Sequence, residues 1–320
     1  MWWAVAERAR AATDARHLAL LRACGGRAVR IEEPEFPARL RELRTPPPVV
    51  YLAGSWTSAN PAVAIVGARN ASADGLDVTR SLAADLARSG IAVLSGLARG
   101  IDTAAHEGAL DAGGRSGAVL GTGIERAYPR ENAALQARLR TSLGLLSEIP
   151  PGSSTRPGCF ASRNRLLAAL SDATIVVQGR GGSGALLTAR EAHDLGRPVG
   201  AVPWDCRDPL GEAPHALIRA GEATLVRRLR DVLDLLGREA RAPSSQWALA
   251  PEEPQPRRAE LPPVESRLLA ALRHRPLPLD VVAAAAGLSA AEAGAALVSL
   301  ELLGLARSEP GGLVRRARSG

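Results

Sequence analysis

The chain has 320 residues, of which 46% are hydrophobic and 23% are charged, and these proportions are typical of a folded globular protein. It contains no lysine, so all 40 basic residues are arginines, and the net charge of +7 favours an anionic partner. Three distant cysteines without a CxxC motif argue against a zinc site or a disulfide framework, and no apolar run approaches the roughly 18 residues of a membrane span. We therefore expect a cytoplasmic protein with reduced thiols, no metal site, no cofactor and no membrane contact.

Residues 1–56 precede the regular part of the sequence as a short lead-in. A helix is predicted from Trp3 to Ala23, and a short strand from Arg27 to Ile31. Prolines then punctuate the chain as far as Pro48, which leads into the apolar residues Val49 to Leu52.

Residues 57–237 alternate between apolar runs and amphipathic stretches. The amphipathic stretches Leu76 to Arg88 and Ile101 to Asp111 are predicted to be helices. The strand-like runs are continuously apolar, which is typical of strands buried on both faces of a parallel sheet. These runs cover residues 62–66, 91–94, 117–120, 143–147, 173–177 and 198–202. The alternation predicts an α/β domain of the Rossmann-like, doubly wound kind.

Residues 238–263 are rich in proline and polar residues and are predicted to be a linker. The remainder, residues 264–320, shows three short helical patterns followed by a hairpin around Gly311 and Gly312. The helices are expected at residues 264–273, 278–286 and 289–303, the last with the capping-box spacing of Ser289 and Glu292. Three helices and a small β-hairpin make a winged-helix domain.

Three successive predicted strands end in glycine-containing turns, which is a pattern typical of anion binding. The first turn is Gly67-Ala68-Arg69, the second is Ser95 to Asp102, and the third contains Gly121 and Gly123. Glycines let the backbone approach a ligand, and a helix that starts at such a turn offers free N–H groups and a positive dipole end. The GxGxxG fingerprint of dinucleotide binding is absent.

Each residue of these turns also has an ordinary structural interpretation. Arg69 could be a surface arginine, and Asp102 could hold Arg99 or a ribose, although capping of the next helix is the favoured role. Gly96 and Gly100 are interpreted as positions of backbone access to the ligand. Glu131 and Asn132 resemble catalytic residues, but the start of a helix after Pro129 explains them better.

Two later segments extend the predicted anion site. Phe160 precedes Arg163, Asn164 and Arg165, so an aromatic ring that could stack on a base lies close to two arginines near a helix start. The alternative is a buried Phe160 that anchors its loop. Further along, Ser183 lies in a glycine-rich turn before another predicted helix, which forms a second anion nest that reaches Thr188.

The order of these motifs resembles the DNA-processing protein A family (DprA, also called Smf) from about residue 30 to residue 236. The motifs are G-A-R, S-G-L-A-R-G-I-D-x-x-A-H, Y-P-x-E-N, F-x-x-R-N-R and S-G-x-L-x-T-A, preceded by Phe36-Pro37-Ala38-Arg39-Leu40. The resemblance implies a Rossmann-like fold, binding of single-stranded DNA, a homodimer, and loading of the RecA recombinase on incoming DNA in natural transformation. The C-terminal domain resembles the winged-helix domain of many members. Members commonly carry a helix-hairpin-helix-like N-terminal domain, which implies a truncated domain or a late start here.

Carried over residue by residue, the resemblance implies a basic DNA-binding pocket without catalytic residues. Its expected members are Gly67, Arg69, Ser95, Gly96, Arg99, Gly100, Asp102, Gly121, Gly123, Phe160, Arg163, Asn164, Arg165, Ser183 and Thr188. The chain departs from the family pattern at Gln178, Ala185, Trp204 and His215, which concerns the far rim of the pocket.

Two other functions compete with DNA binding. One is a nucleotide phosphoribohydrolase of the Rossmann-like group, but Gly181 to Gly184 lack the proline and threonine of that group's P-G-G-x-G-T motif. The other is a nucleotide sensor without catalysis. His106 and His193 are isolated from any Ser/His/Asp arrangement, so a non-enzymatic function is expected.

The predicted last helix of the winged-helix domain is unsuited to reading DNA. Residues 290–301 contain two acidic residues and no basic one, whereas a recognition helix normally faces DNA with arginine or lysine. We therefore expect this domain to contact protein rather than DNA.

Overall fold

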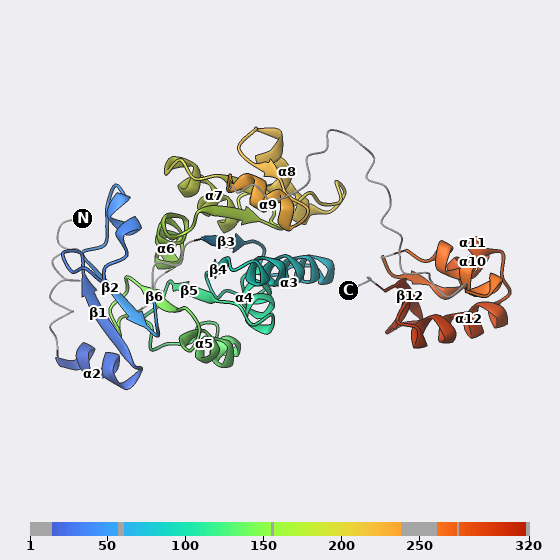
Figure 1. The fold of residues 1–320 in the computed structure, drawn as a ribbon, viewed down its shortest axis with the longest axis horizontal. Coiled ribbons are helices and arrows are strands. Elements are labelled where there is room, and N and C mark those ends of the chain that lie inside the picture. The colour runs from blue at the N-terminus through green and yellow to red at the C-terminus, as the bar shows by residue number, and fades with distance from the viewer. Residues whose placement is uncertain (1–14, 57–60, 155–156, 238–260, 274, 318–320) are drawn as a thin grey trace. The chain divides into compact units, whose positions relative to one another are not determined.

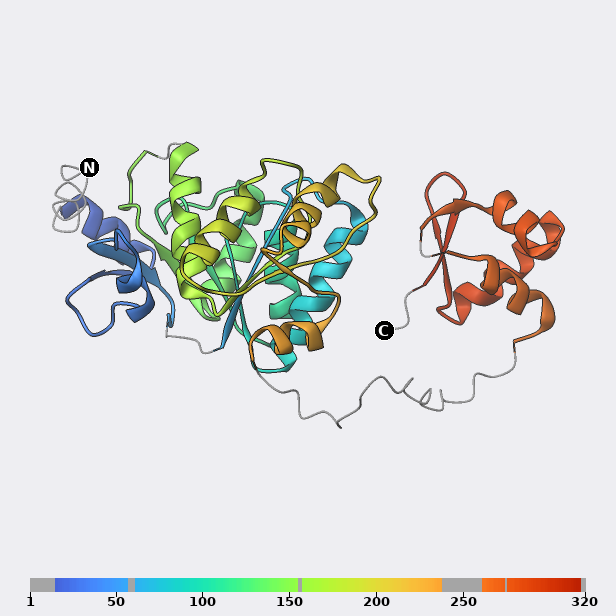
Figure 2. The same ribbon diagram turned by 90° about the horizontal axis from the view of Figure 1, so that it is seen from above.

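The computed structural model describes residues 15–56, 61–154, 157–237, 261–273 and 275–317. The chain divides into two compact units, Met1–Ala242 and Pro243–Gly320 (Figures 1 and 2). Most of the predicted helix from Trp3 and most of the predicted linker lie outside the described residues. The part of that helix that is described runs from Ala15 to Ala23.

The first unit is built on a sheet of nine strands in the order β1-β2-β6-β5-β4-β3-β7-β8-β9. All neighbouring strands from β6 to β9 pair in parallel, which confirms the predicted Rossmann-like α/β fold. All six predicted strands of this region are present, with ends that differ by one residue at most. These six strands are β3 (Ala62–Val66), β4 (Ala92–Ser95), β5 (Ser116–Leu120), β6 (Gly144–Ser147), β7 (Ala173–Val176) and β8 (Val199–Ala201). A further short strand that was not predicted, β9 (Thr224–Leu225), follows them.

The lead-in adds two antiparallel strands to this same sheet. The strand predicted from Arg27 to Ile31 is present as β1, but the sequence did not indicate that it would join this sheet. Strand β2 (Val49–Ala53) pairs with β6, and β1 (Gly26–Arg30) pairs with β2 and forms the edge. All five residues of β2 are buried, so this strand belongs to the core of the unit. A short 3-10 helix, η1 (Ala38–Glu42), is tied to the sheet by the ion pair between Arg39 and Asp172.

Helices cover both faces of the sheet, as Figures 1 and 2 show. Helices α6 and α7 pack with η1 over one apolar cluster, and helices α3, α4 and α9 pack over another on the opposite face. This division follows from the connections, since β3 leads into α3 on one face and β7 leads into α7 on the other. The helices described in this unit are α2 (Ala15–Ala23), α3 (Ala73–Arg88), α4 (Ile101–Asp111), α5 (Ala133–Arg140), α6 (Pro157–Leu170), α7 (Gly184–Asp194), α8 (Glu212–Arg219) and α9 (Leu229–Leu235), with the short 3-10 helices η1, η2 (Arg130–Asn132) and η3 (Pro209–Gly211).

The order of the strands reverses between β3 and β7. From β3 the chain builds outward through β4 and β5, whereas from β7 it builds in the other direction through β8 and β9. The crevice outside the carboxyl ends of strands at such a switch point is where open α/β sheets bind ligands. The topology therefore places the turn after β3 opposite the turn after β7.

The second unit is a winged helix, as predicted. Its elements are α10 (Pro263–Ala271), β10 (Leu277–Pro278), α11 (Leu279–Ala286), α12 (Ala290–Leu302), β11 (Ala306–Glu309) and β12 (Leu313–Arg316). The capping box is formed, because the Ser289 hydroxyl accepts from the Glu292 N–H and the Glu292 carboxylate accepts from the Ser289 N–H. Among the described residues, no single helix is long and apolar enough to cross a membrane. Only α11 and α12 together meet that length and composition, and they are bent by 103°.

Candidate functional site

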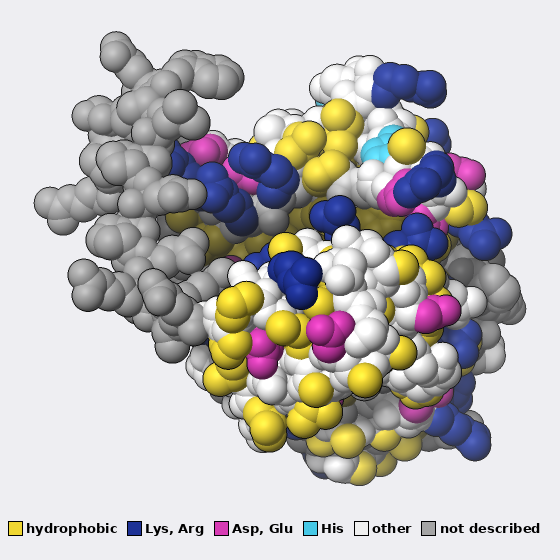
Figure 3. Space-filling model, turned by 90° about the vertical axis from the view of Figure 1, so that its right-hand side faces the viewer, with side chains coloured by type: hydrophobic (Ala, Val, Ile, Leu, Met, Phe, Trp, Pro, Cys, Tyr) yellow, Lys and Arg dark blue, Asp and Glu magenta, His cyan; other side chains and the backbone are white. Residues whose placement is uncertain are grey.

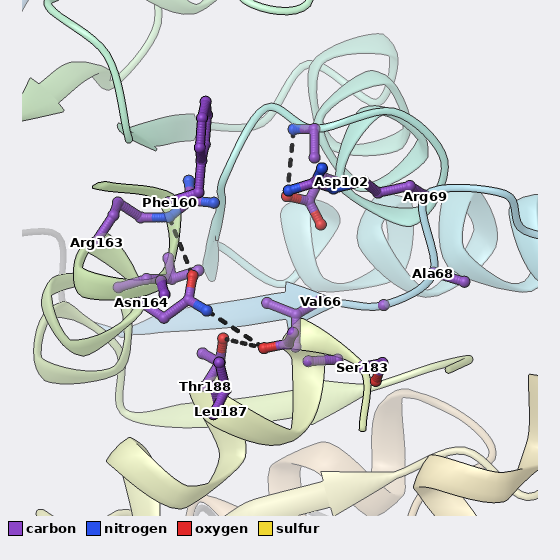
Figure 4. Close-up of a pocket in the computed structure, with 16 residues that line it drawn as sticks. Val66, Ala68, Arg69, Asp102, Phe160, Arg163, Asn164, Ser183, Leu187 and Thr188 are labelled. Carbon is purple, nitrogen blue, oxygen red and sulfur yellow. Dashed lines mark hydrogen bonds between the residues drawn. The ribbon is translucent and has the colours of Figure 1, made fainter. Parts of the chain in front are cut away.

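A pocket of about 330 Å³ opens at the switch point of the sheet (Figure 4). The turn after β3, the first turns of α6 and the start of α7 form most of its wall, and Asp102 of α4 lies at its base. The lining residues are Val66, Gly67, Ala68, Arg69, Ala98, Asp102, Phe160, Ala161, Arg163, Asn164, Leu167, Ser183, Gly184, Ala185, Leu187 and Thr188. Of the residues predicted from the sequence, eight line this pocket: Gly67, Arg69, Asp102, Phe160, Arg163, Asn164, Ser183 and Thr188.

Arg69 and Phe160 form the mouth of the pocket. Arg69 is exposed, its guanidinium carbon lies 5.9 Å from the centre of the Phe160 ring, and it makes no ion pair with any described residue. Phe160 is half-buried and also contacts the ring of Tyr128, with 5.1 Å between the ring centres. The aromatic residue expected near the arginines is thus in contact with one of them. Its ring is not enclosed in the core.

Two buried side chains, those of Asp102 and Asn132, form hydrogen bonds to the main chain of the loop between β4 and α4. One carboxylate oxygen of Asp102 accepts hydrogen bonds from the N–H groups of Gly96 and Ala98 at 3.1 and 3.3 Å. The Asn132 amide donates to the carbonyl oxygen of Leu97, a residue with the unusual φ of 58°. The expected capping role of Asp102 is therefore wrong: Gly100 occupies the N-cap position, and Asp102 fixes the preceding loop instead.

The glycines of these turns serve close packing between neighbouring loops. A Cβ atom on Gly96 would collide with the guanidinium of Arg163, and one on Gly100 would collide with the main chain of Ala68 and Arg69. A Cβ on Gly121 would lie 2.7 Å from the Phe160 ring. Gly100 also has a φ of 74°, which favours glycine. Gly96 and Gly100 thus have a packing role, and their role as points of ligand access stays a prediction.

Arg163 is buried, with 6% of its surface exposed, and its guanidinium is already engaged by the protein. It donates to the carbonyl oxygens of Gly96 and Val119 and, through Nε, to the side chain of Asn164 at 3.2 Å. These bonds join α6 to the ends of β4 and β5. Arg163 therefore has a structural role, and its contact with a phosphate stays a prediction.

Burial and the charge of Arg163 change the titration of two neighbours. Burial raises the pKa of Asp102, although the charge of Arg163 and the loop N–H donors oppose the rise. Burial, and then the charge of Arg163, lower the pKa of His106 to about 3, so this side chain is neutral at physiological pH. His106 Nδ1 lies 2.8 Å from the Ser116 hydroxyl oxygen.

Arg165 lies outside the pocket lining and forms a buried ion pair with Glu148, whose side chain is 1% exposed. Glu148 also accepts a hydrogen bond from Ser162. Arg165 therefore anchors α6 to the segment after β6, and its contact with a phosphate stays a prediction.

The start of α7 forms the far wall. Ser183 is the N-cap of this helix, and its buried hydroxyl has no hydrogen-bond partner among the described residues. The Asn164 amide donates to the carbonyl oxygen of Gly184, which links α6 to α7 across the pocket. Gln178 holds the end of the turn that carries Arg69, on the opposite side of the pocket. Its side-chain oxygen accepts from the Ser72 N–H, and its side-chain nitrogen donates to the Ser72 hydroxyl.

Seven of the predicted residues are not part of the lining: Ser95, Gly96, Arg99, Gly100, Gly121, Gly123 and Arg165. Ser95 is fully buried and donates to the Ile65 carbonyl, whereas Arg99 is exposed and lies 3.9 Å from Glu131. Sequence reasoning did not select Tyr128, although the chain has only two tyrosines and one of them falls beside the predicted third turn. No group of three or more potential metal ligands occurs among the described residues.

Two family models match the chain. The model described as DNA recombination-mediator protein A matches residues 27–237, and the model described as DprA winged helix domain matches residues 251–312. Protein Smf of Synechocystis is 33% identical over 312 residues, which cover 88% of this chain and 77% of that protein. DNA processing protein DprA of Bacillus subtilis is 38% identical over 208 residues, which cover 64% of this chain and 70% of that protein.

Solved structures agree with the sequence matches. DNA processing protein A from Streptococcus pneumoniae superposes with a TM-score of 0.64 at 35% identity, over 69% of this chain and 77% of that one. DNA processing protein A from Helicobacter pylori, whose structure was described for its single-stranded DNA binding mode, superposes with a TM-score of 0.59 at 26% identity, over 65% of this chain and 95% of that one. With both of its units matched, the chain belongs to the DNA recombination-mediator protein A family, whose members are called DprA or Smf.

Proposed function

We propose that the chain is a non-catalytic DNA-processing protein that binds single-stranded DNA in the pocket at the switch point. The observation that carries this proposal is the arrangement of Arg69 and Phe160. An exposed arginine without an ion-pair partner among the described residues lies against an accessible aromatic ring. Single-stranded nucleic acid is bound by this combination, because the cation neutralises phosphate while the ring stacks on a base.

The remaining walls suit an unstacked nucleotide. Leu167, Ala185 and Leu187 give an apolar surface for a base, and the N-terminal end of α7 offers a positive dipole end to a phosphate. The bases of a duplex are already stacked and paired, so entry into a pocket of about 330 Å³ favours a single strand. Asn164, Ser183 and Thr188 are proposed as polar contacts of the bound strand.

Replacement of Phe160 by alanine tests the stacking contact. We expect Phe160→Ala to weaken binding of oligo-dT by about 1–3 kcal/mol and to leave the salt dependence of binding unchanged, because stacking releases no counterions. Fluorescence anisotropy titrations at several salt concentrations measure both quantities. If Phe160→Ala lowers the free energy of unfolding while the affinity for DNA is unchanged, Phe160 is only an anchor of its loop.

The competing enzymatic function receives less support from the pocket. Asp102 is the only acidic residue among those that line it, and its carboxylate already holds the loop before α4. Release of free base from a mononucleotide would reveal a phosphoribohydrolase, and calorimetric titration with mononucleotides would reveal a nucleotide sensor. We expect neither a reaction nor binding of a mononucleotide that is as tight as binding of oligo-dT.

We further propose a cytoplasmic homodimer that loads RecA on incoming DNA during natural transformation. Membership in the family supports this role, and the DNA-binding pocket supplies the strand on which RecA would assemble. RecA filament formation on a single strand should be faster with the protein than without it, and sedimentation should give the mass of two chains. A monomer that leaves RecA assembly unchanged would refute this part.

A further inference from the structure

Tyr128 is an exposed aromatic residue at the rim of the pocket. Half of its surface (50%) is accessible to solvent, which makes it one of the few large hydrophobic side chains left exposed on the described part of the first unit. It is one of two tyrosines in the chain, and the other, Tyr51, is fully buried. An exposed aromatic ring at the rim of a pocket points to a ligand more strongly than a scattered surface aliphatic residue does.

The loop that carries Tyr128 is held at several points. The carbonyl oxygen of Ile124 accepts from both the Gln136 amide and the Arg140 guanidinium, at 3.1 and 2.8 Å. The Thr122 carbonyl accepts from the Ser147 hydroxyl at 2.7 Å. These bonds hold the part of the loop that precedes Tyr128, and the ring itself contacts that of Phe160. An aromatic ring that is held in place before binding loses little conformational entropy on binding.

The ring of Tyr128 continues the aromatic surface of the pocket outward. Its centre lies 5.1 Å from that of Phe160, with 40° between the ring planes, and Phe160 in turn lies against Arg69. In Figure 4 the Phe160 ring stands at the edge of the pocket. Because Phe160 lines the pocket and Tyr128 does not, a base on Phe160 and a base on Tyr128 would belong to different nucleotides.

The charges on either side of Tyr128 suit the backbone of a nucleic acid. Arg126 and Arg130 are both exposed, and neither makes an ion pair with a described residue. The nearest exposed carboxylate in sequence is Glu131, which lies 3.9 Å from Arg99 and is therefore partly neutralised. An exposed aromatic ring that is flanked in sequence by two exposed arginines has the composition of a stacking platform for single-stranded nucleic acid.

We propose that Tyr128 forms a second base-stacking subsite, which takes the nucleotide next to the one held at Phe160, with Arg126 and Arg130 along the backbone. This inference rests on the proposed binding of single-stranded DNA and adds to it the direction in which the strand leaves the pocket. The smallest ligand that uses the full site is therefore a dinucleotide within a strand.

The test compares three oligonucleotides of six residues: one entirely abasic, one with a single thymine, and one with two adjacent thymines. All three have the same backbone, so phosphate contacts are constant and only the number of bases varies. For the unmodified protein, we expect the second thymine to strengthen binding by about 5- to 150-fold, as a full stacking contact implies. Tyr128→Ala should reduce this gain to the statistical factor of about two. Tyr128→Phe is the matched control, because it keeps the ring and should keep the gain.

Two results would overturn the second subsite. The first is that the unmodified protein gains no affinity from the second thymine. The second is that Tyr128→Ala keeps the full gain from the second thymine but binds the oligonucleotide with a single thymine more weakly, because the Tyr128 ring would then only support Phe160. Failure of the proposed function has a different signature: the unmodified protein would bind none of the three oligonucleotides or a longer oligo-dT. Thermal unfolding of both variants confirms that they are folded.

Discussion

Arg69 and Arg163 line the same pocket and carry the same charge, but their surroundings assign them different roles. Arg69 is exposed and lies over an aromatic ring, so its charge is available to a ligand. Arg163 is buried, donates to two main-chain carbonyls and lies close enough to Asp102 for their charges to interact. Burial lowers the pKa of Arg163, the charge of Asp102 opposes this effect, and the charge of Arg69 adds a smaller lowering.

Removal of the buried arginine should damage the fold. Arg163→Ala leaves the carbonyls of Gly96 and Val119 without their donor and removes the charge that compensates Asp102. Leaving a buried carboxylate without a compensating charge costs about 3–5 kcal/mol. Urea unfolding should therefore show a large loss of stability for Arg163→Ala and almost none for Arg69→Ala. Equal unfolding free energies in the two variants, with weaker DNA binding in both, would make Arg163 a ligand of DNA after all.

His106 should make the stability of the first unit depend on pH. Its pKa is about 3 in the folded chain and 6.5 when exposed, so between these values the unfolded state binds the extra proton. Stability then falls as pH decreases below 6.5, by up to about 1.4 kcal/mol per pH unit from this residue. The difference in unfolding free energy between the parent protein and His106→Gln should shrink as the pH is lowered from 7.5 toward 5. A difference that does not change with pH would contradict this assignment.

The sequence could identify which residues gather at the site, but not which of them remain available to a ligand. The pattern around Phe160 correctly predicted that an aromatic ring and arginines lie together. It could not separate Arg163 from Arg69, because the partners of Arg163 lie 67 and 44 residues away, at the ends of β4 and β5. Asp102 was misjudged for a related reason, since its hydrogen bonds run back to the loop before the helix.

Among the secondary-structure elements, the buried parallel strands were the easiest to predict, because each is an uninterrupted apolar run. The sequence did not predict that strands β1 and β2 belong to the same sheet as the parallel strands. The run Val49–Ala53 gave no sign of its partner, since antiparallel pairing with β6 joins residues about 95 positions apart. In the winged helix the helices were evident from their periodicity and from the capping box at Ser289.

Helix α12 occupies the position of a recognition helix in the winged-helix fold, but its surface lacks the basic residues that such a helix normally presents to DNA. It contains no arginine, and Glu292 and Glu301 are its charged residues. Leu302 is 85% exposed and Val298 is 57% exposed, so its outer surface is apolar as well. Figure 3 shows hydrophobic side chains, with acidic ones and some arginines among them, on the surface that is turned to the viewer. Such a surface repels phosphates and suits contact with protein.

Deletion of the winged helix should therefore have little effect on DNA binding. A chain that ends after residue 259 lacks all helices and strands of the winged helix but keeps every residue of the pocket. We expect its affinity for oligo-dT to remain within a few fold of the full chain, and we expect the isolated residues 260–320 to bind duplex DNA weakly. Tight duplex binding by the isolated unit, or loss of oligo-dT binding after the deletion, would show that α12 contacts DNA.

At the scale of the whole molecule, the chain combines a pocket unit with a second unit of different surface chemistry. The pocket unit presents exposed arginines at the carboxyl edge of its sheet, among them Arg69, Arg99 and Arg130. The second unit presents an acidic and apolar helix. This division favours DNA binding by the first unit and protein contact by the second.

The most direct test of the account compares oligo-dT with a duplex of the same length, at about 50 and 200 mM salt, for the parent protein and Arg69→Ala. The account predicts that the single strand binds more tightly than the duplex at both salt concentrations. It also predicts that Arg69→Ala weakens single-strand binding and flattens its salt dependence by about 0.7 in log–log slope, because one phosphate contact is lost. Arg88→Ala, at the far end of α3, should change neither quantity. Equal affinity for both DNAs, or an unchanged slope in Arg69→Ala, would contradict the assignment of this pocket to single-stranded DNA.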